Sequence, residues 1–401
     1  MKYRILIVLL CLLLICGGCS KETPVEPEPA PVAPAEPSTP EPIPEPEPEP
    51  EPEPGVAPVF TEPDYAPGAA VTVDGTDVSR SFLLENETCV DLKEVTDALG
   101  TSLTMDVSGQ ACFSWKGQDV VLQLGNTAAA WGSEALTLPA APVIYQGRYH
   151  VPAVSLCEQL GISVYHDAEQ NHLYCTPAAE SLVIPEGYKV PTLMYHAVSD
   201  DMWGIHELFV SPSDLEEQLK YLQENGYTTL WFEDLANIEQ YEKPVILTFD
   251  DGYMDNYLEA FPLLEKYQAK ATFFVITGSL DVNAKSMTYE QVKELSQSGL
   301  VSIQSHTVNH PYLSDLSREE QEQQLVQSKL DILRITGKEP YALCYPSGKY
   351  NQDTLDLVEE HYLVGVKMNG NDYITGGHPG EINRWYVSRY TTLSEFRSMI
   401  S

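Results

Sequence analysis

Two adjacent aspartates, Asp250 and Asp251, follow the apolar run "PVILTF" and stand directly before a glycine. Like charges this close repel each other, so a buried pair is costly unless a positive charge lies beside it. Downstream, "SHTVNH" holds His306 and His310 at a spacing at which one helical turn places both imidazoles on the same face. Two imidazoles and a carboxylate form a common ligand set for a divalent cation. The pattern predicts a metal site that keeps one aspartate ionised and offsets the repulsion between the two.

The segment that carries these residues alternates short apolar strands with amphipathic helices, from residue 188 to residue 401. This alternation predicts a parallel sheet or barrel, whose chemistry lies at the C-terminal ends of the strands. His196, the two aspartates, His306 and the "CYPSG" loop each come at the end of a predicted strand. The predicted strands are "PTLMYH", "TTLWF", "PVILTF", "ATFFVI", "VSIQSH", "ALCYP" and "LVGVKM". The predicted helices include "PSDLEEQLKYLQENG", with Ser213 as N-cap and Gly226 as C-cap, and "SREEQEQQLVQSKLDILRITG".

Three motifs in this segment, "TFDDG", "SHTVNH" and "YPSG", resemble the first three motifs of the NodB-homology polysaccharide deacetylases, carbohydrate esterase family 4. The resemblance covers residues 188–401, and "MYHAV" and "FVSPSDLEEQLKYLQENGYTTL" are similar to the poly-N-acetylglucosamine deacetylase subgroup. It implies an α/β fold in the form of a distorted (β/α) barrel. The implied activity is metal-dependent hydrolysis of the acetamide groups of N-acetylglucosamine in cell-wall or exopolysaccharide glycan.

The resemblance also assigns roles to the acidic and histidine motifs. Asp251, His306 and His310 would bind the divalent cation, and zinc suits two imidazoles and a carboxylate. Asp250 would be the general base that takes a proton from the metal-bound water.

The "YPSG" loop supplies the remaining substrate contacts that the resemblance implies. The backbone N–H of Ser347 would stabilise the oxyanion, and Gly348 would let the loop turn close to the sugar. Tyr345 and Pro346 are expected to contact the substrate as well.

Two family features are missing from this sequence. Leu343 stands where the family has an arginine before the motif-three proline, and the candidates to replace it are Arg384 and Arg389, of which Arg389 is assigned to the site. The C-terminal Leu-x-His that supplies the general acid is also absent. His196, at the end of the first strand, is assigned as the acid, with His378 of "GGHPG" as the other candidate.

Trp385 completes the predicted site. It is expected either to offer a stacking platform for a sugar or to be a core aromatic, because tryptophan serves both purposes.

Residues 69–178 form an internal repeat. "VDLKEVTDALGTSLTMD" and "VPAVSLCEQLGISVYHD" share their apolar positions, and Gly100 of the first copy matches Gly161 of the second. Each copy predicts a short helix, a glycine C-cap and two strands, in a smaller, duplicated α+β domain. The region resembles the copper amine oxidase N-terminal-like, or stalk, domain of Gram-positive surface proteins. Its histidines are scattered, so a spacer or wall-contacting module is favoured over a metal site.

The first 68 residues indicate an anchor and a spacer. Residues 1–18 have a short positive start and an apolar stretch, and "ICGGCS" resembles the bacterial lipobox, which implies lipidation of Cys19. An ordinary cleaved signal peptide and an uncleaved anchor are the alternatives. Residues 19–68 are predicted to be a disordered linker. Its alternating Pro and Glu residues are expected to form an extended stalk. The alternative is an ordinary disordered linker that has no role as a spacer.

These features place the folded parts outside the cytoplasm. We expect a lipid anchor on the outer face of the cell membrane of a Gram-positive bacterium, with the membrane and a polysaccharide as partners. The net charge of -36 argues against nucleic-acid binding, which needs basic patches. Outside the cytoplasm disulfides are permitted, so Cys89, Cys112, Cys157 and Cys175 either form two bridges or remain buried thiols.

Two other functions stay open on the sequence alone. Loss of the usual acid motif would fit a non-catalytic glycan-binding protein of the cell wall. The same site could also hydrolyse esters, as an O-deacetylase on acetylated xylan-type polymers.

Overall fold

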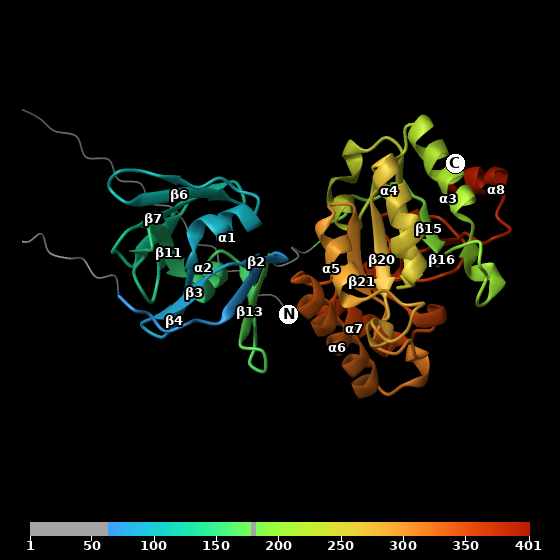
Figure 1. Cartoon of the computed structure of the whole chain (residues 1–401). Coiled ribbons are helices and arrows are strands. Elements are labelled where there is room, and N and C mark those ends of the chain that lie inside the picture. Colours follow the sequence, from blue (N-terminus) through green and yellow to red (C-terminus); the bar gives the residue numbers. More distant parts are fainter. Residues whose placement is uncertain (1–62, 178–181) are drawn as a thin grey trace, which may run out of the picture. The chain divides into compact units, whose positions relative to one another are not determined.

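The computed structural model describes residues 63–177 and 182–401, which are drawn in colour in Figure 1. The predicted signal peptide with Cys19 and almost all of the predicted linker lie outside the described residues. Within the described ranges, no helix has both the length and the apolar character that crossing a membrane requires.

Residues 63–177 contain the two predicted repeats. The helices α1 (Leu92–Ala98) and α2 (Ala153–Gln159) each end before a glycine in the left-handed region, Gly100 and Gly161, both at φ +67°. β5 (Thr104–Met105) and β6 (Gln110–Trp115) follow the first helix, and β12 (Ile162–Asp167) and β13 (His172–Pro177) follow the second. The repeat of helix, glycine and two strands is therefore confirmed.

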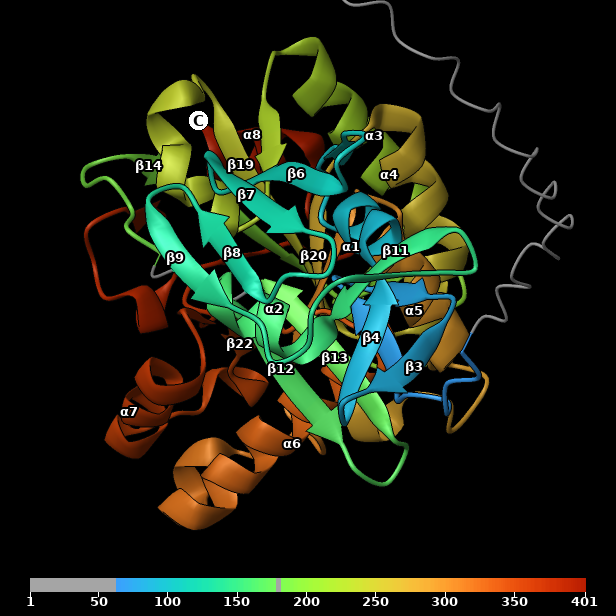
Figure 2. The same ribbon diagram turned by 90° about the vertical axis from the view of Figure 1, so that its left-hand side faces the viewer.

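The two repeats pair through equivalent strands. β4 (Glu87–Asp91) lies antiparallel to β11 (Arg148–Pro152), and Val90 of the first copy stands opposite its counterpart Val151 of the second. Both valines are fully buried, so each repeat covers the apolar face of the other. Figure 2 shows these strands with both helices. The remaining strands are β1 (Ala70–Val73), β2 (Thr76–Val78), β3 (Ser81–Leu84), β7 (Gln118–Gln123), β8 (Ala128–Trp131), β9 (Glu134–Thr137) and β10 (Val143–Tyr145).

The four cysteines of this domain are free thiols in the structure. Cys157 and Cys175 are both buried and lie within hydrogen-bonding distance of each other.

Residues 182–401 form the predicted parallel barrel. In this part of the chain eight strands join in one sheet, and every strand pair in it is parallel. All seven strands expected from the sequence are present. The strands are β15 (Thr192–Tyr195), β18 (Thr228–Leu230), β19 (Pro244–Asp251), β20 (Ala271–Val275), β21 (Val301–Ser305), β22 (Ala342–Cys344), β23 (Val364–Val366) and β25 (Trp385–Tyr386).

A short segment near the C-terminus closes the barrel. Ile382 exchanges backbone hydrogen bonds with Gly365 and Lys367 beside β23, and Trp385 pairs with Leu193 of β15 a few residues later. The segment therefore joins the two outer strands of the parallel array. The irregular closure makes this a distorted barrel, as expected.

Helices surround the strands (Figure 1). Those in this part are α3 (Pro212–Glu224), α4 (Phe261–Tyr267), α5 (Tyr289–Gln297), α6 (Arg318–Thr336), α7 (Gln352–His361) and α8 (Leu393–Ile400). The prediction for α6 is confirmed from its N-cap Ser317 to its left-handed Gly337. For α3 the N-cap was predicted wrongly: Ser211, not Ser213, accepts from Asp214 N, because Pro212 occupies the first helical position.

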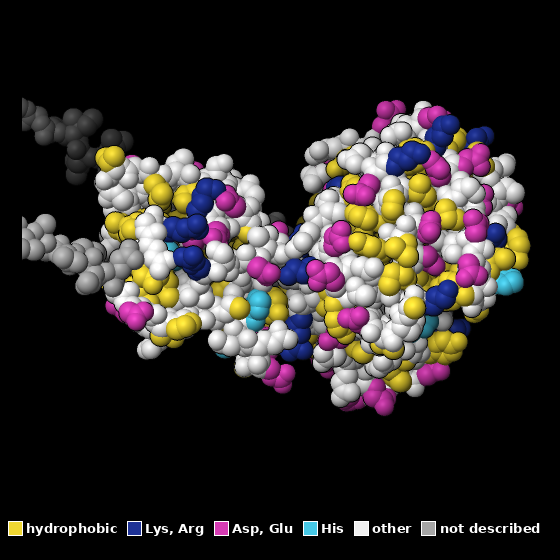
Figure 3. Space-filling model, viewed as in Figure 1, with side chains coloured by type: hydrophobic (Ala, Val, Ile, Leu, Met, Phe, Trp, Pro, Cys, Tyr) yellow, Lys and Arg dark blue, Asp and Glu magenta, His cyan; other side chains and the backbone are white. Residues whose placement is uncertain are grey.

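One short antiparallel strand pair, one short parallel strand pair and several short helical segments complete this part. The pairs are β14 (Lys189–Val190) with β24 (Tyr373–Ile374), and β16 (Ala197–Val198) with β17 (Phe209–Val210). The short helical segments are η1 (His206–Leu208), η2 (Glu233–Gln240), η3 (Asn256–Ala260), η4 (Thr277–Ser279), η5 (Leu313–Asp315), η6 (Pro346–Gly348) and η7 (Pro379–Glu381). On the face shown in Figure 3, acidic and basic side chains are interspersed.

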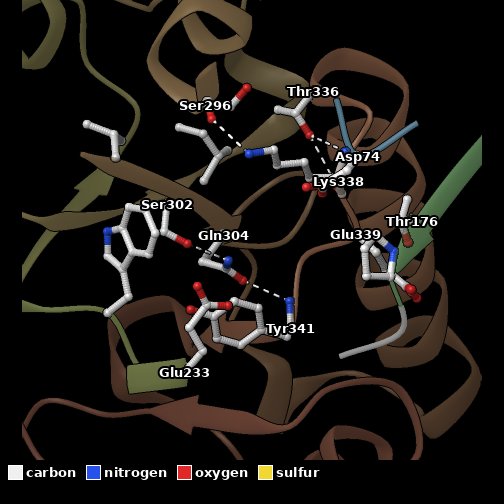
Figure 4. A pocket seen from close by; sticks show the side chains of 14 residues that line it. Asp74, Thr176, Glu233, Ser296, Ser302, Gln304, Thr336, Lys338, Glu339 and Tyr341 are labelled. Atoms are coloured by element: carbon white, nitrogen blue, oxygen red, sulfur yellow. Dashed lines mark hydrogen bonds between the residues drawn. The ribbon is translucent and has the colours of Figure 1, made fainter. Parts of the chain in front are cut away.

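One buried side chain completes the sheet where two strands diverge. β21 and β22 pair only at Ser305 and Leu343, so these two strands are not joined to each other before that point. Gln304 fills the gap, because its Oε1 accepts the N–H group of Tyr341 at 2.8 Å (Figure 4). It also accepts the N–H group of Ala342 at 2.7 Å. Its Nε2 donates to Ser302 Oγ at 2.9 Å.

We expect Gln304→Leu to destabilise the barrel by about 2 to 4 kcal/mol, because it leaves two buried N–H groups without an acceptor. Guanidinium denaturation measures the change. Ser302→Ala is the matched control, since it removes only the outer bond and is expected to cost about 1 kcal/mol or less. Equal stability of Gln304→Leu and wild type would show that the side chain does not support the sheet.

Candidate functional site

The strand register brings the predicted residues to one end of the barrel. Asp251 pairs with Val275, Val275 with Ser305, and Ser305 with Leu343, so β19, β20, β21 and β22 are level at this point. His306 follows directly after this level. The C-terminal ends of parallel strands meet at one edge, and the sequence prediction of a single polar end is thereby met.

Asp251, His306 and His310 form a compact cluster. The Nε2 atoms of His306 and His310 lie 3.5 Å and 3.9 Å from Asp251 Oδ1, and the ligand atoms of all three lie within 4.8 Å of one another. A cation held at about 2.0 to 2.2 Å from each ligand atom needs those atoms about 3 to 3.5 Å apart. The donor set and its spacing fit a divalent ion.

The two histidines are not brought together by a helical turn, so that part of the sequence prediction is wrong. Residues 306–310 form a loop in which Thr307 and His310 have φ values of +64° and +55°. Asp251 and Ser347 have φ values of +77° and +53° as well. Non-glycine residues rarely adopt this conformation, and such strained backbone often marks functional sites.

Hydrogen bonds fix the orientation of the ligand side chains. His306 Nδ1 lies 2.9 Å from the backbone oxygen of Cys344, so this nitrogen carries the proton and Nε2 is left to face Asp251. The phenol of Tyr253 hydrogen-bonds the Asp251 carboxylate. Partners of this kind commonly orient metal ligands, and Tyr253 is one that the sequence motifs did not single out.

The electrostatics of the cluster favour a positive charge. Burial opposes ionisation of Asp251, but the hydrogen bond and charge of His306 hold the pKa of that carboxyl below its ordinary range. Burial would also lower the pKa of His306, yet the hydrogen bond to the Asp251 carboxylate and the charge of Asp250 raise it well above its ordinary value. A bound cation would supply the positive charge that this pocket stabilises.

Asp250 faces a different partner. Arg384 Nη1 donates to its Oδ1 at 2.7 Å, and Nη2 donates to its Oδ2 at 2.8 Å. Both side chains are almost fully buried, with relative exposures of 2% for Asp250 and 1% for Arg384. Although burial favours the protonated acid, the guanidinium holds the pKa of Asp250 below its ordinary value.

Arg384 therefore takes the position for which Arg389 was assigned, and that assignment was wrong. Arg389 Nη1 donates to the backbone oxygen of Ser199, and its Nη2 lies 3.7 Å from Asp200. The two arginines stand in the same short sequence, and spacing alone could not separate them.

A second group of possible ligands, Asp250, His306 and Cys344, also lies within 4.8 Å. Arg384 Nη2 lies 3.0 Å from the Cys344 sulfur and 2.8 Å from Asp250 Oδ2. A fixed guanidinium at this distance repels a cation. The Asp251 cluster is the better metal site.

His196 lies at the predicted place, inside the site. Its ring packs edge-on against Tyr386 at a centroid distance of 5.9 Å, and its buried Nδ1 has no hydrogen-bond partner. Burial lowers its pKa, while Asp250 and Asp251 act in the opposite direction. His378, the other candidate acid, instead pairs with Glu359 at 3.0 Å and does not line the site.

These groups line one cavity of about 780 Å³. Ser347 and Tyr345 lie on its wall, but the Tyr345 hydroxyl is already bound to Gly380 O at 2.6 Å. Pro346 is buried and does not line the cavity. Gly348 has φ +64°, and a Cβ on it would come 2.9 Å from Met368 Cγ, so the loop turns where a side chain would collide.

The tryptophan on the cavity wall is Trp203, not Trp385. Trp385 donates its indole N–H to Asp372 Oδ1 at 2.9 Å and packs against the core, so the core alternative is the correct one. Trp203 packs edge-on against Phe209 and Tyr253 and lines the cavity. It lies on an irregular loop that offered no sequence motif.

Comparison with known families matches both folded parts. Residues 237–366 match the family model described as polysaccharide deacetylase, and residues 72–175 match the copper amine oxidase N-terminal domain. The chain is similar to the solved structure of Streptococcus pyogenes deacetylase PplD in complex with acetate, with 32% sequence identity and a TM-score of 0.50. The aligned region covers 54% of this chain and 99% of PplD.

Two curated relatives match the C-terminal part. YxkH of Bacillus subtilis is 38% identical over 184 residues, which are 44% of this chain and 64% of YxkH. A Staphylococcus aureus protein named poly-beta-1,6-N-acetyl-D-glucosamine N-deacetylase is 27% identical over 191 residues, 41% of this chain and 65% of that protein. The chain thus spans just under two thirds of the length of these two relatives.

We expect the metal-free protein to bind one zinc ion in the Asp251 cluster. His310→Ala should weaken that binding by at least about 100-fold, since loss of a group that merely orients a ligand already costs about 10- to 100-fold. Asp250→Asn should bind the ion with nearly unchanged affinity, because Asp250 faces Arg384. Isothermal titration calorimetry measures the zinc affinity of each variant. His166→Ala is the control, because it removes an exposed histidine far from the cluster in sequence. Unchanged affinity in His310→Ala would exclude this site.

Proposed function

Because the chain belongs to the polysaccharide deacetylase family, whose members are hydrolases of carbon–nitrogen bonds, we propose that residues 188–401 remove acetyl groups from an N-acetylglucosamine polymer. The observation that carries this proposal is that a possible metal site and an ionised carboxylate lie next to each other at one edge of the barrel. The Asp251, His306 and His310 cluster can hold a cation, and the adjacent Asp250 is ionised beside Arg384. The name of the Staphylococcus aureus relative supports the choice of polymer.

The metal and the base have separate roles. A divalent ion, zinc by its ligand set, would be held by Asp251, His306 and His310, and would supply Lewis acidity that lowers the pKa of water and polarises a carbonyl. Asp250 accepts a proton from the attacking water. Its pairing with Arg384 fixes the carboxylate in one orientation and keeps it unprotonated before the reaction.

The loop after β22 supplies the stabilising donor. Ser347 lines the cavity, and its left-handed φ of +53° turns the backbone at this point. In this proposal its backbone N–H stabilises the oxygen of the acetamide as negative charge develops there. A donor fixed in place needs no rearrangement during the reaction, which is the advantage of a preorganised site.

His196 is the proton donor for the leaving amine in this proposal. It lines the same cavity as Asp250, and its Nδ1 is buried without a partner. Burial disfavours its charged form, but the neighbouring carboxylates favour it. Negative charge developing on the substrate adds to this effect and promotes protonation of the ring during the reaction.

The aromatic side of the cavity would bind the sugar. The Trp203 ring is held by edge contacts to Phe209 and Tyr253, and its indole group hydrogen-bonds the half-buried Asp255 carboxylate. Lys285 and Asn283 line the cavity beside it and offer polar groups to sugar hydroxyls. Aromatic rings with nearby polar donors suit the apolar faces and hydroxyl edges of a pyranose.

We further propose that the chain works at the outer face of the membrane. Lipidation at Cys19 would anchor it, and the Pro/Glu tract of residues 24–55 would hold the folded parts at a distance, on the order of 100 Å when extended. The repeat domain of residues 69–178 would then act as a spacer within the cell wall.

Acetate release from N-acetylglucosamine oligomers tests the activity. The zinc-loaded wild type is expected to deacetylate them, and Asp250→Asn to lower kcat by about 100- to 10,000-fold, because a general base contributes on this scale. A mass-spectrometric panel of poly-N-acetylglucosamine, chitin and peptidoglycan fragments, with chelator as control, identifies the polymer. Glycan binding without acetate release would favour the non-catalytic alternative, and preference for acetylated xylan would favour the O-deacetylase.

The acid can be tested through the leaving group. An amine leaves poorly without protonation, whereas an activated phenolate leaves without help. His196→Ala is therefore expected to lower kcat on the glycan amide by about 100-fold or more but to change hydrolysis of an aryl acetate by only a few fold. His378→Ala is the matched control. An equal loss on both substrates would show that His196 does not act as the proton donor.

A further inference from the structure

The side chain of Cys344 lies between Asp250, Arg384 and His306 in the buried part of the site, and no catalytic motif assigns it a role. Its sulfur is 3.0 Å from Arg384 Nη2, 3.4 Å from Asp250 Oδ2 and 3.9 Å from His306 Nε2. Its backbone oxygen accepts from His306 Nδ1. The residue is fully buried and therefore contacts these groups without competing water.

The hydrogen bonds of Arg384 show what the sulfur does. A guanidinium has five N–H donors, and all five find an acceptor here. Nε donates to Lys367 O at 3.3 Å, and Nη1 donates to Thr248 Oγ1 at 2.9 Å and to Asp250 Oδ1 at 2.7 Å. Nη2 donates to Asp250 Oδ2 at 2.8 Å and to the Cys344 sulfur at 3.0 Å. The sulfur is the acceptor for the fifth hydrogen.

An unsatisfied donor on a buried charged group is costly, so the arginine would shift if the sulfur were removed. Asp250 would shift with it, because the two groups are joined by two parallel hydrogen bonds. The thiol also donates to Asp250 Oδ2, which adds a direct contact to the base. A small displacement of a catalytic group lowers the rate strongly even when the substrate still binds.

We propose that Cys344 is a positioning residue: its sulfur completes the hydrogen bonding of Arg384 and thereby holds Asp250 in the orientation needed to take a proton. This proposal rests on the proposed deacetylase function for its effect on rate. The contact between Cys344 and Arg384 does not depend on that function and can be tested separately.

The kinetic test compares three variants and one control variant of the full chain with wild type, all loaded with zinc. Cys344→Ala is expected to lower kcat about 10-fold with KM within about twofold, because the loss affects the base and not the sugar contacts. Cys344→Ser restores an acceptor and is expected to stay within about threefold of wild type. Thr248→Val removes the acceptor of an Nη1 hydrogen and should also lower kcat. Cys89→Ala, a buried cysteine of the repeat domain, is the control for the same chemical change and should keep full activity.

Two kinetic results would overturn the proposal. Full kcat in Cys344→Ala would show that the sulfur is not needed. Equal losses in Cys344→Ala and Cys344→Ser would show that the site needs the volume of sulfur and not an acceptor. Zinc affinity should be unchanged in Cys344→Ala, because the side chain is not part of the Asp251 cluster, and a loss of zinc would also contradict the proposal.

A double-mutant cycle separates this proposal from the proposed function. Cys344→Ala should lower the thermal midpoint clearly in the wild-type background and much less in Arg384→Leu, which has no donor to satisfy. If the wild type releases no acetate from any polymer, the proposed function fails while this coupling still supports the contact. Additive shifts in the midpoint would overturn the contact itself.

Discussion

The buried ion pair between Asp250 and Arg384 is the interaction on which the site depends. Taking two charges out of water is expensive, and their attraction offsets that cost only when the geometry is good and the remaining donors are satisfied. Both conditions hold here, since the pair is joined by two hydrogen bonds and the guanidinium has further acceptors in Thr248 and Cys344. Removal of one partner would leave a bare charge in the core.

The same pair links the site to the closure of the barrel. Arg384 lies between Ile382, which bonds to the backbone beside β23, and Trp385, which pairs with β15. The segment that joins the two ends of the strand array is therefore also the segment that delivers the arginine to the base. Closure and ionisation of Asp250 depend on each other, because a displaced segment would remove the positive charge that keeps the carboxylate ionised.

Residues with regular spacing could be predicted from the sequence, and residues placed by irregular chain could not. Apolar runs marked the parallel strands, and the acids and histidines at their ends marked the metal cluster. Arg384 could not be distinguished from Arg389, because their positions depend on how the last segment crosses the barrel mouth. Trp203 was missed for the same reason, since the loop between β16 and η1 carries no periodic pattern. The histidine spacing suggested a helical turn, but left-handed residues bring the rings together instead.

The two adjacent aspartates avoid mutual repulsion through the geometry of a strand end. Successive side chains of a strand point in opposite directions, so neighbours in sequence need not face the same group. Asp250 turns into the barrel toward Arg384, while Asp251, with its left-handed backbone, turns toward the two histidines. Each carboxylate thus has its own positive or cation-binding partner. The opposite directions of the two side chains explain why a base and a metal ligand can be neighbours in the sequence and still have separate environments.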